Sequence, residues 1–286
     1  MTELYNPFVL KEVEVLKGHP TSWVDYVNML IDGNHIPAHE VVVIKNPKYL
    51  KKLAPLMQST NIRTISNYLM WRALMYHMSD MNREAGEIRE KFIKEVSGIN
   101  SDPPRWKKCT KEVGFNNMAD NNLRVVASSM YIEKYFVPEA KVEMLDMIGN
   151  LKSAFKKILE DIDWMDTNTK SQAFNKLQVM NEFIAYPDEL THEDIVAEYH
   201  SGLSINEEDF YGNKLRLNKW NKILKQSRLR EKVDKTDWRD HSVVPVINAF
   251  YKPKANAMVF PAGILQGVFF NHKVIFMVAS YIIITY

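Results

Sequence analysis

The histidines are the first residues to consider, because paired histidines are the usual protein ligands of a catalytic zinc ion. A zinc-bound water needs two histidines one helical turn apart, with a glutamate between them that accepts a proton. The most similar stretch to this His-Glu-x-x-His spacing is 39–43, which reads His-Glu-Val-Val-Val and has valine at the second ligand position. His35 and His39 are four positions apart, but Pro37 between them removes the helical geometry. We therefore expect no zinc site within these residues.

The other candidate ligands do not form a metal-binding pattern either. His192 and His200 are eight positions apart, which is typical of exposed helix positions, and His77 lies within a helical pattern. Cys109 is the only cysteine, so it can neither form an internal disulfide nor contribute to a multi-cysteine zinc site. A spectator or buried thiol is the expected role of Cys109.

The composition indicates a globular protein with an almost balanced charge. Of the 286 residues, 46% are hydrophobic and 25% are charged, which is enough to bury a large core. The net charge is only +2, and the basic residues are scattered along the chain, so no nucleic-acid partner is expected. The start of the chain has an acidic residue at Glu3, a proline at Pro7 and no apolar stretch, so we expect no secretory signal in the chain as given.

The spacing of apolar residues predicts helices over most of the chain. Ser22 and the Asn46-Pro47 pair are typical helix starts. A single long helix, bent near Gly86, is predicted over 62–96. Further helices are expected over 22–33, 47–56, 120–136, 138–165, 166–183, 192–200 and 206–228, with a short one near Trp106 and Cys109.

The pattern changes near the end of the chain, where a β-hairpin is expected. Residues 243–251 are rich in β-branched and aromatic side chains, 252–256 form a turn, and 257–260 form a second strand. The predicted fold class is therefore mainly α, a multi-helix domain with a short C-terminal β-hairpin.

Several stretches resemble the neprilysin family of zinc metalloendopeptidases. They are Asp-Trp-Met-Asp at 163–166, Arg-Glu-Lys-Val-Asp at 230–234, Val-Ile-Asn-Ala-Phe-Tyr at 246–251 and Val-Phe-Pro-Ala-Gly-Ile-Leu-Gln at 259–266. The last two follow one another at the family's spacing, and the resemblance extends over roughly residues 20–270. It implies an extracellular-facing, membrane-bound or secreted family that hydrolyses peptides with zinc as its cofactor.

The resemblance also implies a substrate-binding role for Asn248 and Ala249, which would bond the backbone of a peptide beside the scissile bond. An exposed strand edge offers N–H and C=O groups to an extended peptide, and an Asn side chain adds a donor and an acceptor. The alternative is that Asn248 is only a hairpin residue, because asparagine is common near turns.

In the family a His-Glu-x-x-His motif would follow the stretch 259–266, and this motif does not occur within residues 1–286. We therefore expect a fragment truncated before the zinc motif, which binds no zinc and is inactive alone. Its expected domains are a helical peptidase domain at 1–240, the start of the catalytic domain at 241–271 and an unrelated apolar tail at 272–286. From Val274 to Ile284 that tail is too short to span a membrane.

Two other functions remain open at this point. One is a non-catalytic module that uses the strand at Asn248 and Ala249 to bind peptides or to form a homo- or hetero-dimer. The other is a fragment with no independent function. A fragment of this kind would leave apolar surface uncovered.

Overall fold

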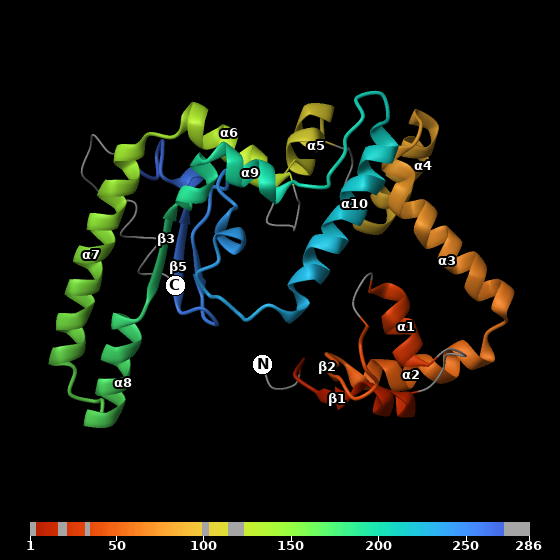
Figure 1. Cartoon of the computed structure of the whole chain (residues 1–286), viewed down its shortest axis with the longest axis horizontal. Helices are drawn as coiled ribbons and strands as arrows, with labels where there is room; N and C mark the ends of the chain where they lie inside the picture. Colours follow the sequence, from red (N-terminus) through yellow and green to blue (C-terminus); the bar gives the residue numbers. More distant parts are fainter. Residues whose placement is uncertain (1–3, 17–21, 32–34, 99–102, 114–122, 272–286) are drawn as a thin grey trace. The chain divides into compact units, whose positions relative to one another are not determined.

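The computed structural model describes residues 4–16, 22–31, 35–98, 103–113 and 123–271. Within them the chain is mainly helical with little β-structure, which confirms the predicted fold class (Figure 1). Contacts divide the chain into two compact units. Unit 1 comprises Met1–Asp102 and Ser204–Glu231, and unit 2 comprises Pro103–Leu203 and Lys232–Tyr286.

Unit 1 combines a two-stranded sheet with helices. Strands β1 and β2 are antiparallel, with Phe8 opposite Val42. The elements are β1 (Pro7–Val9), the 3-10 helix η2 (Leu10–Leu16), α1 (Trp23–Leu30), β2 (Val41–Val43), α2 (Pro47–Ser59), α3 (Ile62–His77), η3 (Met78–Asp80), α4 (Arg83–Ser97), α10 (Phe210–Ser227) and η5 (Arg228–Arg230). The two sequence segments of this unit are joined by an ion pair in which the Arg230 guanidinium donates two hydrogen bonds to the Glu40 carboxylate, at 3.0 and 2.9 Å.

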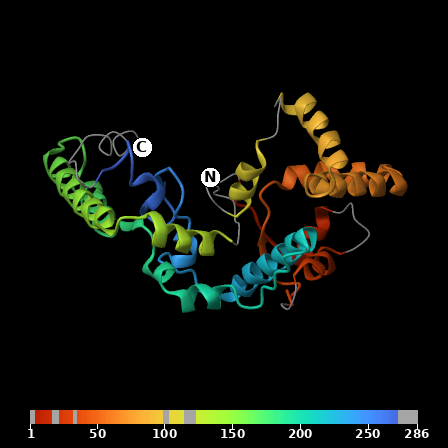
Figure 2. The ribbon, with the colours of Figure 1, turned by 90° about the horizontal axis from the view of Figure 1, so that it is seen from above.

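The predicted single helix over 62–96 is wrong, because the chain forms two helices there, α3 and α4. Figure 2 shows that they run in different directions from the break between them. Asn82 begins α4, since its side-chain oxygen accepts the N–H of Ala85 at 3.0 Å. At the break, Asp80 pairs with Lys214 of α10 at 2.7 Å. Gly86, where the bend was expected, lies inside α4.

Unit 2 packs helices against a three-stranded sheet. Its helix α7 lies beside α8 and along β3 (Figure 1). The elements are α5 (Arg105–Glu112), α6 (Arg124–Tyr135), α7 (Pro138–Asp161), α8 (Thr167–Gln178), β3 (Asn181–Ala185), η4 (Asp188–Thr191), α9 (Glu193–Tyr199), η6 (Trp238–His241), β4 (Phe250–Lys252), β5 (Ala257–Pro261) and η7 (Ala262–Ile264).

The sheet of unit 2 has the order β3-β5-β4. Strands β4 and β5 form the predicted hairpin, with Phe250 opposite Val259. Strand β3 pairs with β5 in parallel, with Phe183 also opposite Val259. The predicted helix over 166–183 is therefore too long. Asp166 caps α8 at the expected start of the helix, but α8 ends at Gln178, since the residues from Asn181 on pair with β5.

The core of unit 2 joins segments that are far apart in the sequence. Val125, Leu190, Val244 and Ala262 are each fully buried, and they come from α6, η4, the segment before β4 and η7. Burial of such side chains stabilises the fold by roughly 1.5–3 kcal/mol each for the larger ones. Strand β5 and the segments on either side of the hairpin are thus anchored in the core of unit 2.

Two expectations are unaffected by these observations. The predicted domain boundary at residue 240 differs from the boundaries of the contact units, and it stays a prediction. The apolar tail at 272–286 lies outside the described residues. Of the helices that the structure describes, none combines the length and the apolar character needed to cross a membrane.

Candidate peptide-binding edge

Strand β4 is at the edge of the sheet of unit 2. Because β5 lies between β3 and β4, one side of β4 is unpaired within the described part of the chain. The main-chain N–H and C=O groups on such a side can pair with an extended peptide.

The predicted residues Asn248 and Ala249 lie directly before β4. Asn248 is exposed, and its side-chain oxygen accepts the N–H of Ala249 at 2.8 Å. Ala249 is partly buried and packs against the core cluster of unit 2. One side chain therefore faces solvent while the other anchors the segment. Their contact with a substrate stays a prediction.

The far end of β4 contacts a buried histidine. Lys252 Nζ lies 3.1 Å from the carbonyl oxygen of Asp240 and 3.3 Å from His241 Nδ1. The His241 ring stacks on Phe183 of β3, with ring centroids 3.3 Å apart and an angle of 12°. Its Nε2 lies 3.3 Å from the carbonyl oxygen of Lys235. The neutral ring therefore donates a hydrogen bond from Nε2 and accepts a hydrogen bond from Lys252 at Nδ1.

Burial sets the protonation of this pair. It lowers the pKa of His241 below 6.5, and the neighbouring Lys252 charge lowers it further. Burial also lowers the pKa of Lys252, which the carboxylate of Asp240 partly opposes. Both groups are thus less easily protonated than in water.

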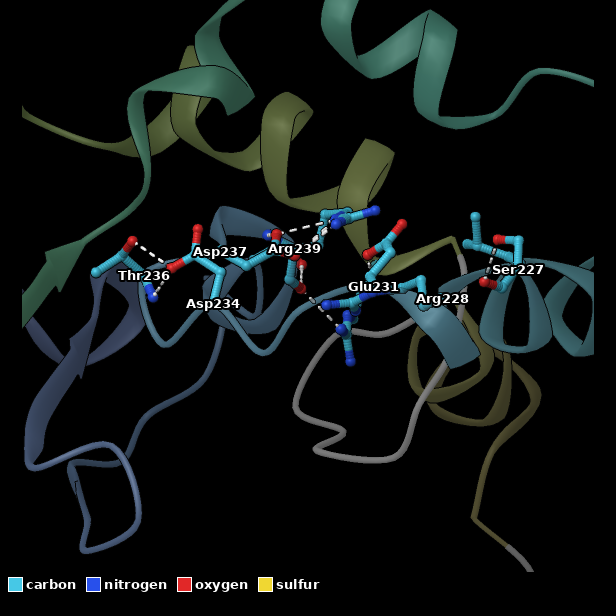
Figure 3. Close-up of polar contacts among 10 residues, drawn as sticks. Ser227, Arg228, Glu231, Asp234, Thr236, Asp237 and Arg239 are labelled. Carbon is cyan, nitrogen blue, oxygen red and sulfur yellow. Dashed lines mark hydrogen bonds and ion pairs between the residues drawn. The ribbon is translucent and has the colours of Figure 1, made fainter. Parts of the chain in front are cut away.

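The turns that lead into His241 are fixed by local side-chain contacts (Figure 3). Asp234 accepts the N–H and the hydroxyl of Thr236 at 2.8 and 2.7 Å, and these bonds lower the pKa of Asp234. Asp237 caps η6 by accepting the N–H of Arg239 at 2.9 Å, and it also pairs with the Arg239 guanidinium at 2.6 Å. Short polar residues therefore set the path of the chain before the edge strand.

A cavity of about 160 Å³ lies along β3 and the residues that follow it. Lys141, Asp188, His241 and Val243 contribute to its wall. Lys141 and Asp188 are already paired with each other at 2.6 Å, so their charges are satisfied within the protein.

The residues that the structure describes do not fit a zinc ion. Both carboxylate oxygens of Glu40 bind Arg230, whose hydrogen bonds lower the pKa of Glu40, and Val43 lies in β2 without a ligand atom. Over those same residues, no three side chains of histidine, cysteine, aspartate or glutamate gather closely enough to hold a metal. Cys109 is exposed and free.

Two residues that support the edge were missed from the sequence. Ser128 is fully buried on α6 and bonds the backbone before β4. Gly263 lies against the backbone of Val246. The available signal for Ser128 was its place between Val125 and Ile132, at the spacing of a buried helix face. No local signal marked Gly263, since its contact involves residues distant in the sequence.

Known proteins match nearly the whole chain. Residues 1–187 match the description "Peptidase family M13". The chain is 31% identical to Neprilysin-2 of Drosophila melanogaster over 278 residues, covering 94% of this chain and 36% of that protein. It is 32% identical to human Neprilysin over 277 residues, with the same two shares. The chain thus spans about 36% of the length of these curated relatives.

Solved structures agree with the sequence matches. The open state of the zinc metalloprotease Zmp1 of Mycobacterium tuberculosis superposes with a TM-score of 0.77 at 26% identity, covering 96% of this chain and 40% of that one. Its inhibitor complex gives 0.75, also at 26% identity, covering 94% and 38%. The resemblance inferred from residues 163–166 and 246–266 is therefore confirmed, and the chain belongs to peptidase family M13, the neprilysin-type zinc metallopeptidases.

Proposed function

We propose that these residues form part of the substrate-binding wall of a neprilysin-type zinc endopeptidase. In this proposal an extended peptide pairs with the free edge of β4, and Asn248 and Ala249 bond its backbone. Supporting observations are the edge position of β4 and the exposure of Asn248 directly before it. The relatives named metalloprotease or neprilysin make peptides the class of ligand to test.

The exposure of Asn248 beside an unpaired strand is the observation that carries this proposal. Its side-chain oxygen is bonded to the N–H of Ala249, and no other partner of this side chain is found within the described residues. The amide nitrogen is thus available to donate to a peptide carbonyl, while the edge supplies main-chain bonds. Ala249 packs its small side chain on the core and its N–H is bonded to Asn248, so in this proposal it is the carbonyl oxygen of Ala249 that accepts from the peptide.

The test is the dissociation constant of a fluorescent extended peptide, measured by anisotropy with the chain and its Asn248→Ala variant. Loss of one uncharged hydrogen bond should weaken binding about threefold to tenfold. The matched control is Asn150→Ala, an exposed asparagine on α7 that lies away from the edge and should leave the constant unchanged. Equal affinities for all three proteins would rule out a role for Asn248.

Hydrolysis is a separate part of the proposal. Since the His-Glu-x-x-His motif does not occur in residues 1–286, we expect this stretch alone to bind peptides without cleaving them. A fluorogenic peptide incubated with the chain and zinc should release no signal above the buffer rate. Cleavage that a chelator abolishes and that zinc restores would contradict this expectation.

The same edge supports a second function, the pairing of two chains. Antiparallel addition of a second β4 would use the same N–H and C=O groups as a bound peptide. Sedimentation velocity over a range of concentrations tests for this dimer. If the edge is shared, adding the peptide dissociates the dimer, whereas a dimer insensitive to peptide would involve another surface.

A further inference from the structure

The segment that presents the candidate peptide edge is buried before it becomes a strand. Ser242 and Val244 are fully buried and Val246 is 6% exposed, but pairing with β5 begins only at Phe250. Contacts other than the sheet ladder must therefore fix the path of residues 242–249.

Ser128 of α6 makes two of these contacts with a single hydroxyl. Its Oγ donates to the carbonyl oxygen of Ser242 at 2.8 Å and accepts the N–H of Val244 at 3.3 Å. A serine hydroxyl has one hydrogen and two lone pairs, so it can make both bonds at once. All three residues are fully buried, so water has no access to these groups.

The same face of α6 holds the chain slightly earlier. Arg124 is one helical turn before Ser128, and its Nη2 donates to the carbonyl oxygen of Arg239 at 3.0 Å. The hydroxyl of Ser242 donates to the same carbonyl oxygen at 2.9 Å. Residues 239–244 are thus bonded to one face of α6 through their main chain.

The segment also lies against η7. The carbonyl oxygen of Val244 accepts the N–H of Gly263 at 3.0 Å and that of Val246 at 2.8 Å. A Cβ atom on Gly263 would lie 2.6 Å from the nitrogen of Val246, so the two backbones are in direct contact. Between α6 and η7 the segment therefore has little freedom to shift.

We propose that Ser128 is a positioning residue for the peptide edge. Its hydroxyl fixes Ser242 and Val244, and this sets where Asn248 and Ala249, a few residues further on, meet an extended peptide. Ser128 does not itself touch the peptide. The inference rests on the proposed function for the ligand, but the placement of the segment can be measured without one.

The residue type supports this role. Ser128 lies on the buried face of α6 between Val125 and Ile132, where an apolar side chain would be the usual choice. An alanine there would leave the Ser242 carbonyl and the Val244 N–H buried without these partners, and the segment would move to recover them. A cysteine would keep the size but would be a weaker donor and acceptor.

The experiment compares the whole chain with its Ser128→Ala and Ser128→Cys variants. Peptide affinity is measured by anisotropy, and amide hydrogen exchange is followed in fragments covering 243–250 and, for reference, α7. We expect Ser128→Ala to weaken peptide binding about tenfold, as for a lost buried hydrogen bond, and to speed exchange in 243–250 but not in α7. Ser128→Cys should be intermediate, and it replaces the alanine variant if that protein fails to fold.

The matched control is Ile148→Val, a core change in α7 that removes one methylene and no hydrogen bond of Ser128. It should lower stability while keeping peptide affinity within about twofold, because a merely structural loss does not move the edge. Unchanged affinity and unchanged exchange in 243–250 for Ser128→Ala would overturn the inference. If the unaltered chain binds no peptide, the proposed function fails, and the exchange comparison alone decides the role of Ser128.

Discussion

At the scale of single residues, the contact between Gly263 and Val246 makes a strict demand. An added Cβ would lie 2.6 Å from a backbone nitrogen and 2.8 Å from a carbonyl oxygen, and a backbone cannot rotate away as a side chain can. Gly263 is also buried. The position is therefore closed to every residue with a Cβ atom unless η7 or the segment before β4 moves.

We predict that Gly263→Ala lowers the free energy of unfolding by about 1–3 kcal/mol through overpacking. Urea unfolding followed by circular dichroism measures this change. The matched control is Gly149→Ala within α7, where a Cβ meets nothing within 4 Å and the substitution should instead stabilise by about 0.5–1 kcal/mol. Equal effects at the two glycines would mean that η7 adapts freely.

His241 predicts a dependence of stability on pH. Burial and the Lys252 charge lower its pKa in the folded state below the unfolded value of about 6.5. The unfolded chain therefore binds a proton more readily, so this contribution to stability is present above pH 6.5 and is lost as the pH falls through the lower folded pKa. Between pH 7.5 and 5.5 the urea midpoint should fall.

Replacement of the histidine separates this effect from other groups. His241→Gln cannot titrate, so its urea midpoint should fall less over the same pH range than that of the unaltered chain. The control is His192→Gln, an exposed residue whose removal should leave the slope as it was. A slope that persists in His241→Gln would assign the pH dependence to other residues.

At the scale of the elements, two lysines of α7 hold the ends of β3. Lys152 Nζ contacts Glu182 at 2.7 Å and the carbonyl oxygen of Met180 at 3.4 Å. Three turns earlier, Lys141 Nζ contacts the carbonyl oxygen of Tyr186 at 3.0 Å. The edge strand β3 is thus bonded to α7 at both ends, whereas the outer side of β4, at the other edge of the sheet, is unpaired within the described residues.

We expect Lys152→Met to lower the free energy of unfolding by about 1 kcal/mol, because it removes bonds to a partly shielded carboxylate and a carbonyl. Lys157→Met, at an exposed position of the same helix, should change it by less than about 0.5 kcal/mol. Chemical unfolding of both variants gives the comparison. If Lys157→Met lowered the free energy of unfolding as much as Lys152→Met, the loss would come from a change in the helix itself and not from the contacts between Lys152 and β3.

The elements also show what the sequence can and cannot reveal. The helix starts expected at residues 138 and 166 are confirmed, since Pro138 begins α7 and Asp166 caps α8, and both signals depend on neighbouring residues. The first part of β3, residues 181–183, was predicted as helix, because its pairing partner β5 lies far along the chain. The break after His77 was missed because the apolar spacing continues across it. Asn248 was chosen through resemblance, whereas Ser128 required the packed structure.

At the scale of the whole molecule, the core of unit 2 is built from segments that no local pattern connects. Leu190 of η4 is fully buried in a cluster with Met144 of α7 and Val244 before β4. Because these segments meet only in the folded chain, one deletion in the cluster should weaken the whole unit.

We predict that Leu190→Ala destabilises unit 2 by about 2–5 kcal/mol, from lost transfer energy and the remaining cavity. Differential scanning calorimetry measures the loss. Val142→Ala, which shortens a side chain that is 68% exposed on α7, should have an effect below about 0.5 kcal/mol. A small effect at Leu190 would show that the cluster can collapse around the missing atoms.

The parallel pairing of β3 with β5 has a consequence for how the protein is made. Between these strands the chain passes through Ser204–Glu231, which belongs to unit 1, before it returns to β5. On a ribosome β3 emerges early and must wait for its partner, and pairings between such distant residues form slowly. Until residue 261 has left the exit tunnel, β3 has no neighbouring strand, so this interval is when a chaperone would be needed most.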